Sequence, residues 1–315
     1  MTGALALAVD LGGTKIEAAL VDAAGRLLAG SRTRRPTGPA TTPTSLWSAV
    51  NGVVSEALAA LPAGAAIAGA GIGSAGPVDL AAGTVAPVNM PGVHGFELVK
   101  VVQDDLEALS LAVPVHLRHD GGALALAEAW KGATAGSRAS MSIVVSTGIG
   151  GGFVIEGRSM SGASGNAGHL GQTRSEAWNG LTLEEVASGP GSVAWARDEG
   201  WHGGAGEDLG RDAASGDPIA RAAIERSASA VGRALADAAT LIDLEIIAVG
   251  GGFARVSSDY VELVAAAAAA SAALAYSRAT RIVRTGLGDE GPLIGAAAIV
   301  LRELRSTSSS IEQVP

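Results

Sequence analysis

LALAVDLGGTKIEAALVDAAGRLL, from Leu5 to Leu28, is the stretch on which the expected fold depends. An apolar run ends at Asp10, a Gly-Gly turn follows, and a second apolar run leads to another glycine turn. Short apolar runs bounded by glycine turns are typical of β-hairpins, and we expect Arg26 to Ala29 to form a third strand. The glycines leave backbone N–H groups open to a phosphate, while the Asp10 carboxylate can hold a hydrated divalent cation. An ordinary hairpin turn explains this stretch equally well.

Two common phosphate-binding motifs do not fit the glycine turns of this chain. A strand rather than a helix is expected after Gly13, and no Gly-Lys-Ser/Thr occurs there, which argues against a P-loop. Gly71 to Gly76 matches G-x-G-x-x-G, but Pro77 follows at once. The strand–turn–helix context of a dinucleotide site is therefore missing. We interpret this segment as a loop whose backbone is closely approached.

Composition excludes several classes of protein and site. The length of 315 residues favours about two domains, and 48% hydrophobic with 17% charged residues favours a globular chain. The net charge of -9 disfavours a nucleic-acid partner. The absence of cysteine excludes disulfides, thiolate zinc sites and cysteine nucleophiles. No signal peptide is evident, and the Ala-rich run from Val264 to Leu274 is interpreted as a helix outside any membrane, so we expect a cytoplasmic protein.

The order of elements predicts an α/β protein built twice from one plan. Met141 to Val145 leads into a second glycine turn, Ser146 to Gly152, and Phe153 to Ile155 is again strand-like. This repeats the opening hairpin and indicates a duplicated fold with a phosphate turn in each half. Strands alternate with helices elsewhere, which is typical of α/β proteins, and the crevice between the halves is the expected active site.

Domain limits follow from this plan. We expect a smaller α/β domain over residues 1–117, joined by a C-terminal helix at about 291–305, and a larger α/β domain over 118–290. The polar, proline-containing segment from Arg32 to Pro43 is expected to be a loop. The Ser-rich residues 306–315 are expected to be a disordered tail.

The chain resembles the ROK family of sugar kinases and repressors, which has the two-domain actin-like ATPase (ribonuclease H-like) fold with its active site in the interdomain cleft. The resemblance covers nearly the whole chain. It rests on motifs in the family's order: Asp10 to Lys15, Ser146 to Gly152, Gly162 to Gln172, Gly250 to Gly252, and Gly295-Ala296-Ala297.

The resemblance implies an ATP-dependent kinase in which Asp120 is the general base that takes the proton from a sugar hydroxyl. A helix N-cap is the structural alternative for Asp120. ATP and Mg²⁺ are the implied cofactors, with Asp10 orienting Mg²⁺ through water. The implied phosphate and ATP contacts are Asp10, Gly12, Gly13, Thr14, Lys15, Thr147, Gly148, Gly251 and Gly252. The implied substrate contacts are Ser74, Gly76, Asn89, His119, Asp120, His169, Gln172 and Glu184.

The chain departs from the family pattern on the substrate side. His169 stands where the family has a sugar-contacting Glu, Gln172 where it has a zinc-ligating His, and His119 where it has an Asn. The family's three zinc-binding cysteines align with Ser175, Ala177 and Thr182. Because a tetrahedral zinc site needs its thiolates and imidazole together, we expect no zinc site.

Several alternatives stay open. The acceptor is a hexose, a hexosamine or a C7 cyclitol, with plain glucose placed in doubt by the two histidines, and polyphosphate is an alternative donor to ATP. A catalytically weak sugar sensor is the alternative to a kinase. Family repressors carry a winged helix-turn-helix before the first motif, and only nine residues precede Asp10, so we expect no DNA partner. A homodimer without nucleic-acid or membrane partners is expected.

Overall fold

The computed structural model describes residues 4–303 of the chain. The expected tail at 306–315 lies outside the described residues. The described chain folds into two compact units: the first comprises residues 4–132, 157–167 and 287–303, and the second comprises 133–156 and 168–286. Within residues 4–303, no helix combines the length and the apolar character that crossing a membrane requires.

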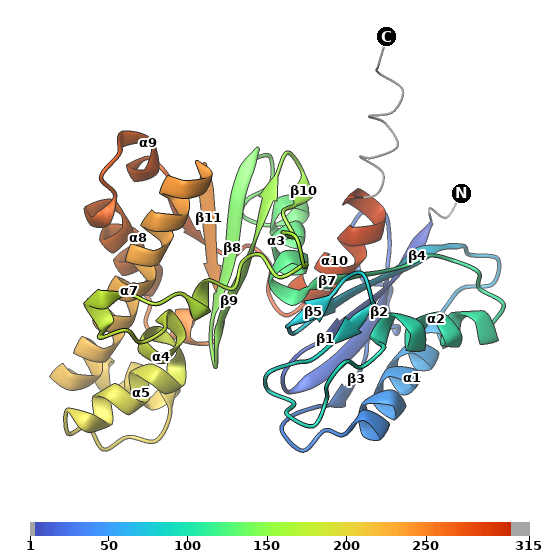
Figure 1. The fold of residues 1–315 in the computed structure, drawn as a ribbon, viewed down its shortest axis with the longest axis horizontal. Coiled ribbons are helices and arrows are strands. Elements are labelled where there is room, and N and C mark those ends of the chain that lie inside the picture. Colours follow the sequence, from blue (N-terminus) through green and yellow to red (C-terminus); the bar gives the residue numbers. More distant parts are fainter. Residues whose placement is uncertain (1–3, 304–315) are drawn as a thin grey trace, which may run out of the picture. The chain divides into compact units, whose positions relative to one another are not determined.

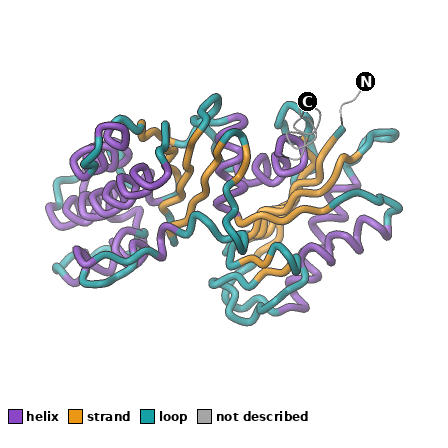
Figure 2. Tube along the Cα trace, turned by 45° about the horizontal axis from the view of Figure 1, so that its top comes forward, coloured by secondary structure: helices purple, strands orange, loops and turns teal. Residues whose placement is uncertain are grey.

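The first unit is built on a sheet with the strand order β3-β2-β1-β4-β7. β1 pairs antiparallel with β2 and parallel with β4, which pairs parallel with β7 (Figures 1 and 2). The chain enters the sheet through the hairpin expected from the opening stretch. The strands are β1 (Leu5–Leu11), β2 (Lys15–Val21), β3 (Thr33–Pro36), β4 (Ile67–Ser74) and β7 (Val115–His119).

Both faces of this sheet are covered by helices, and successive side chains of β1 alternate between the two faces. Leu7 and Leu11 point into a core shared with α1 (Pro43–Ala59) and α2 (Leu98–Ala108), whereas Ala6 and Ala8 face α10. Small side chains on the second face let α10 (Gly291–Ala298) pack closely (Figure 1). At Gly71 of β4, a Cβ atom would lie 1.8 Å from the carbonyl oxygen of Ala296.

The expected third strand at Arg26 to Ala29 is wrong. Leu27 forms only an isolated bridge with Val21, because Asp22 closes a tight turn by accepting the N–H groups of Ala24 and Arg26. The third strand is instead β3, which lies within the segment expected to be a loop. Arg34 of β3 pairs with Glu17 of β2 across the two strands, a contact that residue-by-residue propensity does not reveal.

The segment after β4 confirms that it is not a dinucleotide turn. Gly76 and Pro77 are joined by a cis peptide bond, and the chain continues as the short hairpin of β5 (Val78–Asp79) and β6 (Thr84–Val85) rather than as a helix. Asn166 holds this hairpin by accepting the Val78 N–H at 2.9 Å and donating to the Val78 carbonyl at 2.8 Å.

The second unit repeats the plan of the first, which confirms the expected duplication. Its strands follow the order β9-β8-β11-β12, again with one antiparallel hairpin and parallel partners on the other side of its first strand. The helices α7 and α8 approach closely, since a Cβ at Gly232 would lie 2.6 Å from the Val264 carbonyl oxygen. The strands of this unit are β8 (Ala139–Val145), β9 (Ile149–Ile155), β11 (Ile246–Gly250) and β12 (Arg281–Arg284), whereas β10 (Arg158–Ser159) lies in residues 157–167 of the first unit. The helices are α4 (Leu183–Ala187), α5 (Gly189–Asp198), α6 (Gly206–Ala214), α7 (Pro218–Ile242), α8 (Tyr260–Ser271) and α9 (Ala275–Arg278).

The expected boundary between residues 117 and 118 differs from the division of the structure. The helix that follows, α3 (Asp120–Lys131), belongs to the first unit, and the chain leaves that unit only after residue 132. The reason is its packing on α10, where a Cβ at Gly295 would lie 2.2 Å from the Ala123 carbonyl oxygen. The expected C-terminal helix is present as α10 followed by a π-helical turn, η4 (Ile299–Glu303).

Candidate active site

The first glycine turn joins β1 to β2 and is closed by its own backbone. The Gly12 N–H donates to the Lys15 carbonyl at 2.9 Å, and the Thr37 hydroxyl donates to the Gly12 carbonyl at 2.9 Å. A Cβ at Gly13 would lie 1.7 Å from Nδ2 of Asn89. Glycine is therefore needed at position 13 because the Asn89 amide lies on the turn, which brings together a predicted phosphate residue and a predicted substrate residue.

Asp10 lies at the end of β1, and its side chain is buried. Burial, together with the carboxylates of Asp120 and Glu17, raises the pKa of Asp10 to about 7 against the opposing effect of Lys15 and Arg32. Two carboxyl groups that interact through a partly desolvated region oppose each other's ionisation. A divalent cation relieves this opposition, so the donor chemistry of Asp10 and Asp120 fits Mg²⁺.

Glu17, on β2 opposite Asp10, holds a cluster of basic side chains that sequence reasoning missed. Its carboxylate pairs with Lys15 at 2.6 Å, Arg34 at 2.9 Å and Arg32 at 3.2 Å. Burial acts to raise the pKa of Glu17, but these contacts lower it below its usual range. Lys15 is thereby held beside the first glycine turn. An acidic residue within the otherwise apolar run of β2 was the available signal.

Asp120 is the first residue of α3, and His119 is the last residue of β7. Oδ1 of Asp120 accepts the N–H of Gly121 at 2.7 Å and lies 2.9 Å from Nε2 of His119. The imidazole is almost fully buried, whereas the Asp120 side chain is 43% exposed. Both of these contacts are made by Oδ1 rather than by Oδ2. Asp120 is not the N-cap residue, which is His119.

The remaining predicted residues of the first unit lie around this carboxylate and turn. Ser74 stands opposite His119 in the pairing of β4 with β7, but its hydroxyl is buried and donates to the Ala75 carbonyl at 2.9 Å. The Gly76 carbonyl accepts the Val88 N–H at 3.1 Å, next to Asn89. The Thr14 side chain is exposed. The first unit thus gathers ten of the predicted residues: Asp10, Gly12, Gly13, Thr14, Lys15, Ser74, Gly76, Asn89, His119 and Asp120.

The second glycine turn joins β8 to β9, and Glu184 anchors it. Oε2 of Glu184 accepts the Ile149 N–H at 2.7 Å and lies 2.6 Å from where a Cβ at Gly148 would be. Its other oxygen accepts the Gln172 side-chain amide at 3.3 Å. Glu184 was predicted to contact the substrate, and in the structure its carboxylate contacts the turn. Thr147, at the tip of the turn, is exposed.

The glycine-rich segment from Gly162 to Gln172 ends against this same turn. A Cβ at Gly168 would lie 2.2 Å from the Gly151 carbonyl oxygen, and one at Gly171 would lie 2.1 Å from that of Ile149. These close approaches explain why the segment needs glycine. His169 and Gln172 are carried beside the turn by the short helix η1 (Leu170–Gln172).

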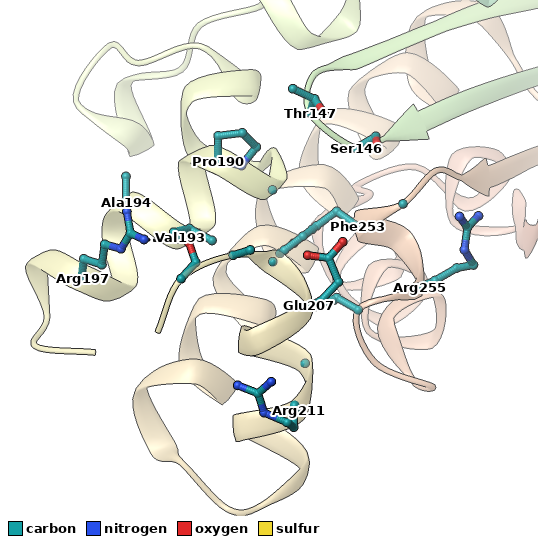
Figure 3. Close-up of a pocket in the computed structure, with 17 residues that line it drawn as sticks. Ser146, Thr147, Pro190, Val193, Ala194, Arg197, Glu207, Arg211, Phe253 and Arg255 are labelled. Carbon is teal, nitrogen blue, oxygen red and sulfur yellow. Dashed lines mark hydrogen bonds between the residues drawn. The ribbon is translucent and has the colours of Figure 1, made fainter. Parts of the chain in front are cut away.

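A pocket of about 640 Å³ opens next to the second turn, within the second unit (Figure 3). Ser146 and Thr147 line it from the turn, with side chains of α5 and α6 and the segment after β11 around it. Phe253 forms part of its wall: a Cβ at Gly189 or Gly206 would lie 3.3 or 3.4 Å from Cδ2 of its ring. These residues of α5 and α6 were not identified from the sequence as part of a site. The available signal was the sequence Gly189-Pro190-Gly191, which is typical of a helix start but does not indicate a pocket.

The two predicted glycines after β11 have different positions. Gly251 has φ +105° and its Cβ would lie 2.4 Å from the Val145 carbonyl oxygen, so glycine is required for packing against β8. Gly252 lines the pocket, close to the Ser146 hydroxyl. The Gly189 N–H, at the start of α5, donates to the Ser146 carbonyl at 2.8 Å. The pocket, the second turn and the N-terminal end of α5 thus adjoin one another.

The residues aligned with the family's zinc ligands do not fit a zinc ion. Ala177 has no donor atom, and the hydroxyls present serve as helix caps: Ser175 accepts the Ala177 N–H at 3.3 Å, and Thr182 accepts the Glu185 N–H at 3.1 Å. Gln172 supplies an amide in place of an imidazole. Within residues 4–303, no group of three or more His, Asp or Glu side chains is arranged to hold a metal ion.

Comparisons with known proteins identify the family. The ROK family model matches residues 6–303. N-acetylmannosamine kinase of Salmonella typhi is 34% identical over 267 residues, covering 82% of this chain and 87% of the relative. The ROK hexokinase structure from Thermus thermophilus has a TM-score of 0.81 at 31% identity, covering 96% and 99% of the two chains. The Streptomyces griseus ROK glucokinase in complex with glucose and AMPPNP has a TM-score of 0.76 at 27% identity, covering 94% and 99%. With its duplicated α/β sheets of the actin-like ATPase type, this chain belongs to the ROK family.

Proposed function

We propose that this protein is an ATP-dependent kinase that transfers the γ-phosphoryl group to a hydroxyl of a hexose-like sugar, with Asp120 as the general base. ATP-dependent sugar phosphorylation is the activity that membership of the family and its kinase relatives support. The observation that carries the assignment of the base is the Asp120 carboxylate, with Oδ1 engaged by Gly121 and His119.

The role of Asp120 follows from this geometry. A carboxylate within hydrogen-bond reach of a hydroxyl orients the attacking oxygen and accepts its proton. With Oδ1 contacted by Gly121 and His119, Oδ2 is the oxygen that receives the hydroxyl proton. His119 donates to Asp120 through Nε2–H, the hydrogen bond that this contact requires. His119 thus orients the base.

The second unit supports nucleotide binding. The pocket of about 640 Å³ is within the size range of small-molecule sites, and its apolar wall at Phe253 suits the flat adenine base. The second glycine turn adjoins this pocket, and Gly148 at the turn has no side chain to keep a phosphate from the backbone N–H groups. We assign Thr147, Gly148 and Gly252 to the nucleotide, while Gly251 acts through packing.

The first unit supports the binding of the phosphate groups and of Mg²⁺. Gly12, Gly13, Thr14 and Lys15 are assigned to phosphate oxygens, with Lys15 held in place by Glu17. Asp10 would hold Mg²⁺ through water, and the cation would neutralise charge on the transferring phosphoryl group when bound.

We assign the acceptor to the substrate-side residues Ser74, Gly76, Asn89, His119, His169 and Gln172, while Glu184 acts through its contacts with the second turn and with Gln172. N-acetylmannosamine and glucose are the sugars named for the relatives, and a C7 cyclitol shares their ring of hydroxyl groups. His169 in place of the family's Glu changes the hydrogen bonds that the site offers, which favours an acceptor other than glucose. A homodimer in the cytoplasm without nucleic-acid partners completes the proposal, and the net charge of -9 supports the last point.

The experiment measures formation of the phosphorylated acceptor over a panel of hexoses, N-acylhexosamines and cyclitols, with ATP or polyphosphate as the donor. Asp120→Asn protein, purified in parallel, supplies the background. We expect at least one acceptor to give turnover well above this background with ATP and Mg²⁺. Turnover no higher than the Asp120→Asn background with every acceptor would reject the kinase assignment in favour of a binding protein.

A further inference from the structure

We propose that a stack of Arg226 and Trp178 takes the place of a bound metal in holding residues 172–184, and so positions Glu184 against the second glycine turn. This inference rests on the proposed function for its kinetic readout only. The stack, the loop and the turn all belong to the second unit.

The stack consists of the Arg226 guanidinium and two indoles, and the guanidinium of Arg233 also lies over one of these indoles. The Arg226 guanidinium, on α7, lies 5.8 Å from the ring centroid of Trp178 and 5.4 Å from that of Trp195 on α5. Arg233, two turns further along α7, lies 5.9 Å from the Trp178 ring. Burial lowers the pKa of Arg226, which shows that its charge is partly removed from water. Desolvation strengthens a cation–π contact.

Trp178 is the anchor of an otherwise exposed loop. From Gln172 to Leu181, every residue except Trp178 is exposed. The loop is closed at its base by a bridge between Arg174 and Thr182, and the Arg174 guanidinium donates to the Gly180 carbonyl at 2.6 Å. The loop is therefore closed by hydrogen bonds and joined to α7 through the Trp178 indole.

The same arginine also holds the helix that carries Glu184. Arg226 donates to the Val186 carbonyl at 2.7 Å, and the neighbouring Ser227 hydroxyl donates to the Ala187 carbonyl at 2.7 Å. Both carbonyls belong to α4, whose second residue is Glu184. Arg226 therefore contacts both the loop, through the Trp178 ring, and the helix that follows it, through the Val186 carbonyl of α4.

Glu184 connects the loop and α4 to the second glycine turn. One oxygen of Glu184 accepts the Ile149 N–H of the second turn. The other accepts the side-chain amide of Gln172, so that the two ends of the segment 172–184 are joined. The hydroxyls of Ser175 and Thr182 are used as helix caps, so the segment has no donor set for a zinc ion. Arg226 and Trp178 are positioning residues: they act on the turn through Glu184.

Three variants test the stack, and one serves as a matched control. Arg226→Met keeps the aliphatic stem without the guanidinium, Trp178→Leu removes the indole, and Trp178→Phe keeps an aromatic ring. Arg302→Met is the control, because Arg302 also stacks on an indole, 5.8 Å from the Trp130 ring, but in the first unit. For each protein, kcat and KM for ATP and acceptor, the melting temperature and the zinc content after chelation are measured.

We expect Arg226→Met and Trp178→Leu to raise the KM for ATP by about 2- to 30-fold, the range that one such contact supports, with kcat near the parent value. Trp178→Phe should recover most of this loss, and Arg302→Met should leave KM unchanged. A double-mutant cycle of Trp178→Leu with Glu184→Gln should be non-additive, because both act on one turn.

Additive effects in the cycle, or a lower melting temperature without a change in KM, would show that the stack serves stability alone and overturn the proposal. About one zinc per chain would overturn the metal replacement. Failure of the proposed function gives a different result, because the unmodified protein then phosphorylates no acceptor. The zinc content and the melting temperatures of the variants still test the stack in that case.

Discussion

Nε2 of His119 lies 2.9 Å from Oδ1 of Asp120, the same oxygen that accepts the Gly121 N–H. The two residues are consecutive, but they belong to different elements, since β7 ends at His119 and α3 begins at Asp120. The strand-to-helix transition turns the buried imidazole toward the carboxylate. A family position associated with the sugar is thereby used to orient the proposed base.

Removing the proposed base should abolish turnover without abolishing nucleotide binding. Asp120→Asn and Asp120→Ala are expected to lower kcat by about 10²–10⁴-fold, the usual contribution of general-base catalysis. ATP affinity should stay close to that of the parent, since the proposed nucleotide pocket lies in the second unit. Turnover and calorimetric ATP binding are measured on the same preparations. Near-parental turnover of either variant would remove Asp120 from the mechanism.

Loss of the orienting imidazole should reduce kcat more than it changes KM for ATP. A hydrogen bond to a charged group contributes about 1.5–3 kcal/mol, so His119→Ala is expected to lower kcat by roughly 10- to 150-fold. His119→Asn, which restores a donor, should recover part of the loss. His116→Ala removes a half-buried imidazole from the same strand and serves as the control. Equal effects of His116→Ala and His119→Ala would indicate a general disturbance of β7.

The substrate preference should depend on His169. An ionised Glu only accepts hydrogen bonds, whereas a neutral His donates from one nitrogen and accepts at the other. The wrong acceptor leaves a buried polar group without a partner, at a cost of about 1–3 kcal/mol. Glucose should therefore be a poor substrate, and His169→Glu should raise its kcat/KM relative to the best acceptor. A ratio unchanged by His169→Glu would assign His169 to packing.

The ion pair between Arg221 of α7 and Asp259, which precedes α8, should make stability depend on acid pH. The Arg221 guanidinium, 2.8 Å away, lowers the pKa of Asp259 from 3.8 to about 2. A lowered pKa means that the stabilisation is fully present above about pH 4 and is lost as the pH falls through about 2. Because the Asp259 side chain is more than a third exposed and that of Arg221 about a third, we expect less than about 1 kcal/mol.

The measurement compares the unfolding free energies of the parent and Asp259→Asn proteins from pH 7 to pH 2. The difference should shrink toward zero at the acid end. A difference that stays constant with pH would mean that the Asp259 charge does not contribute through this pair.

Much of this protein follows from local sequence. The glycine turns after β1 and β8 are recognisable because apolar runs lead into residues without side chains, and the same plan predicts the duplicated α/β sheets. Asp120 was identifiable because the resemblance to the family implies a general base at the start of the helix that follows this short strand. The prediction that Gly71 to Gly76 is not a dinucleotide turn needed only Pro77.

Other features depend on contacts between residues far apart in the chain, which local patterns do not contain. β3 forms where Arg34 reaches Glu17, and α3 joins the first unit because Gly295 lets α10 approach Ala123. Glu184 meets Ile149 only in the folded chain, 35 residues away in sequence. The sequence by itself determined which chemical groups the protein carries. Tertiary structure decided which groups meet, because long-range packing sets the distances on which hydrogen bonds and ion pairs depend.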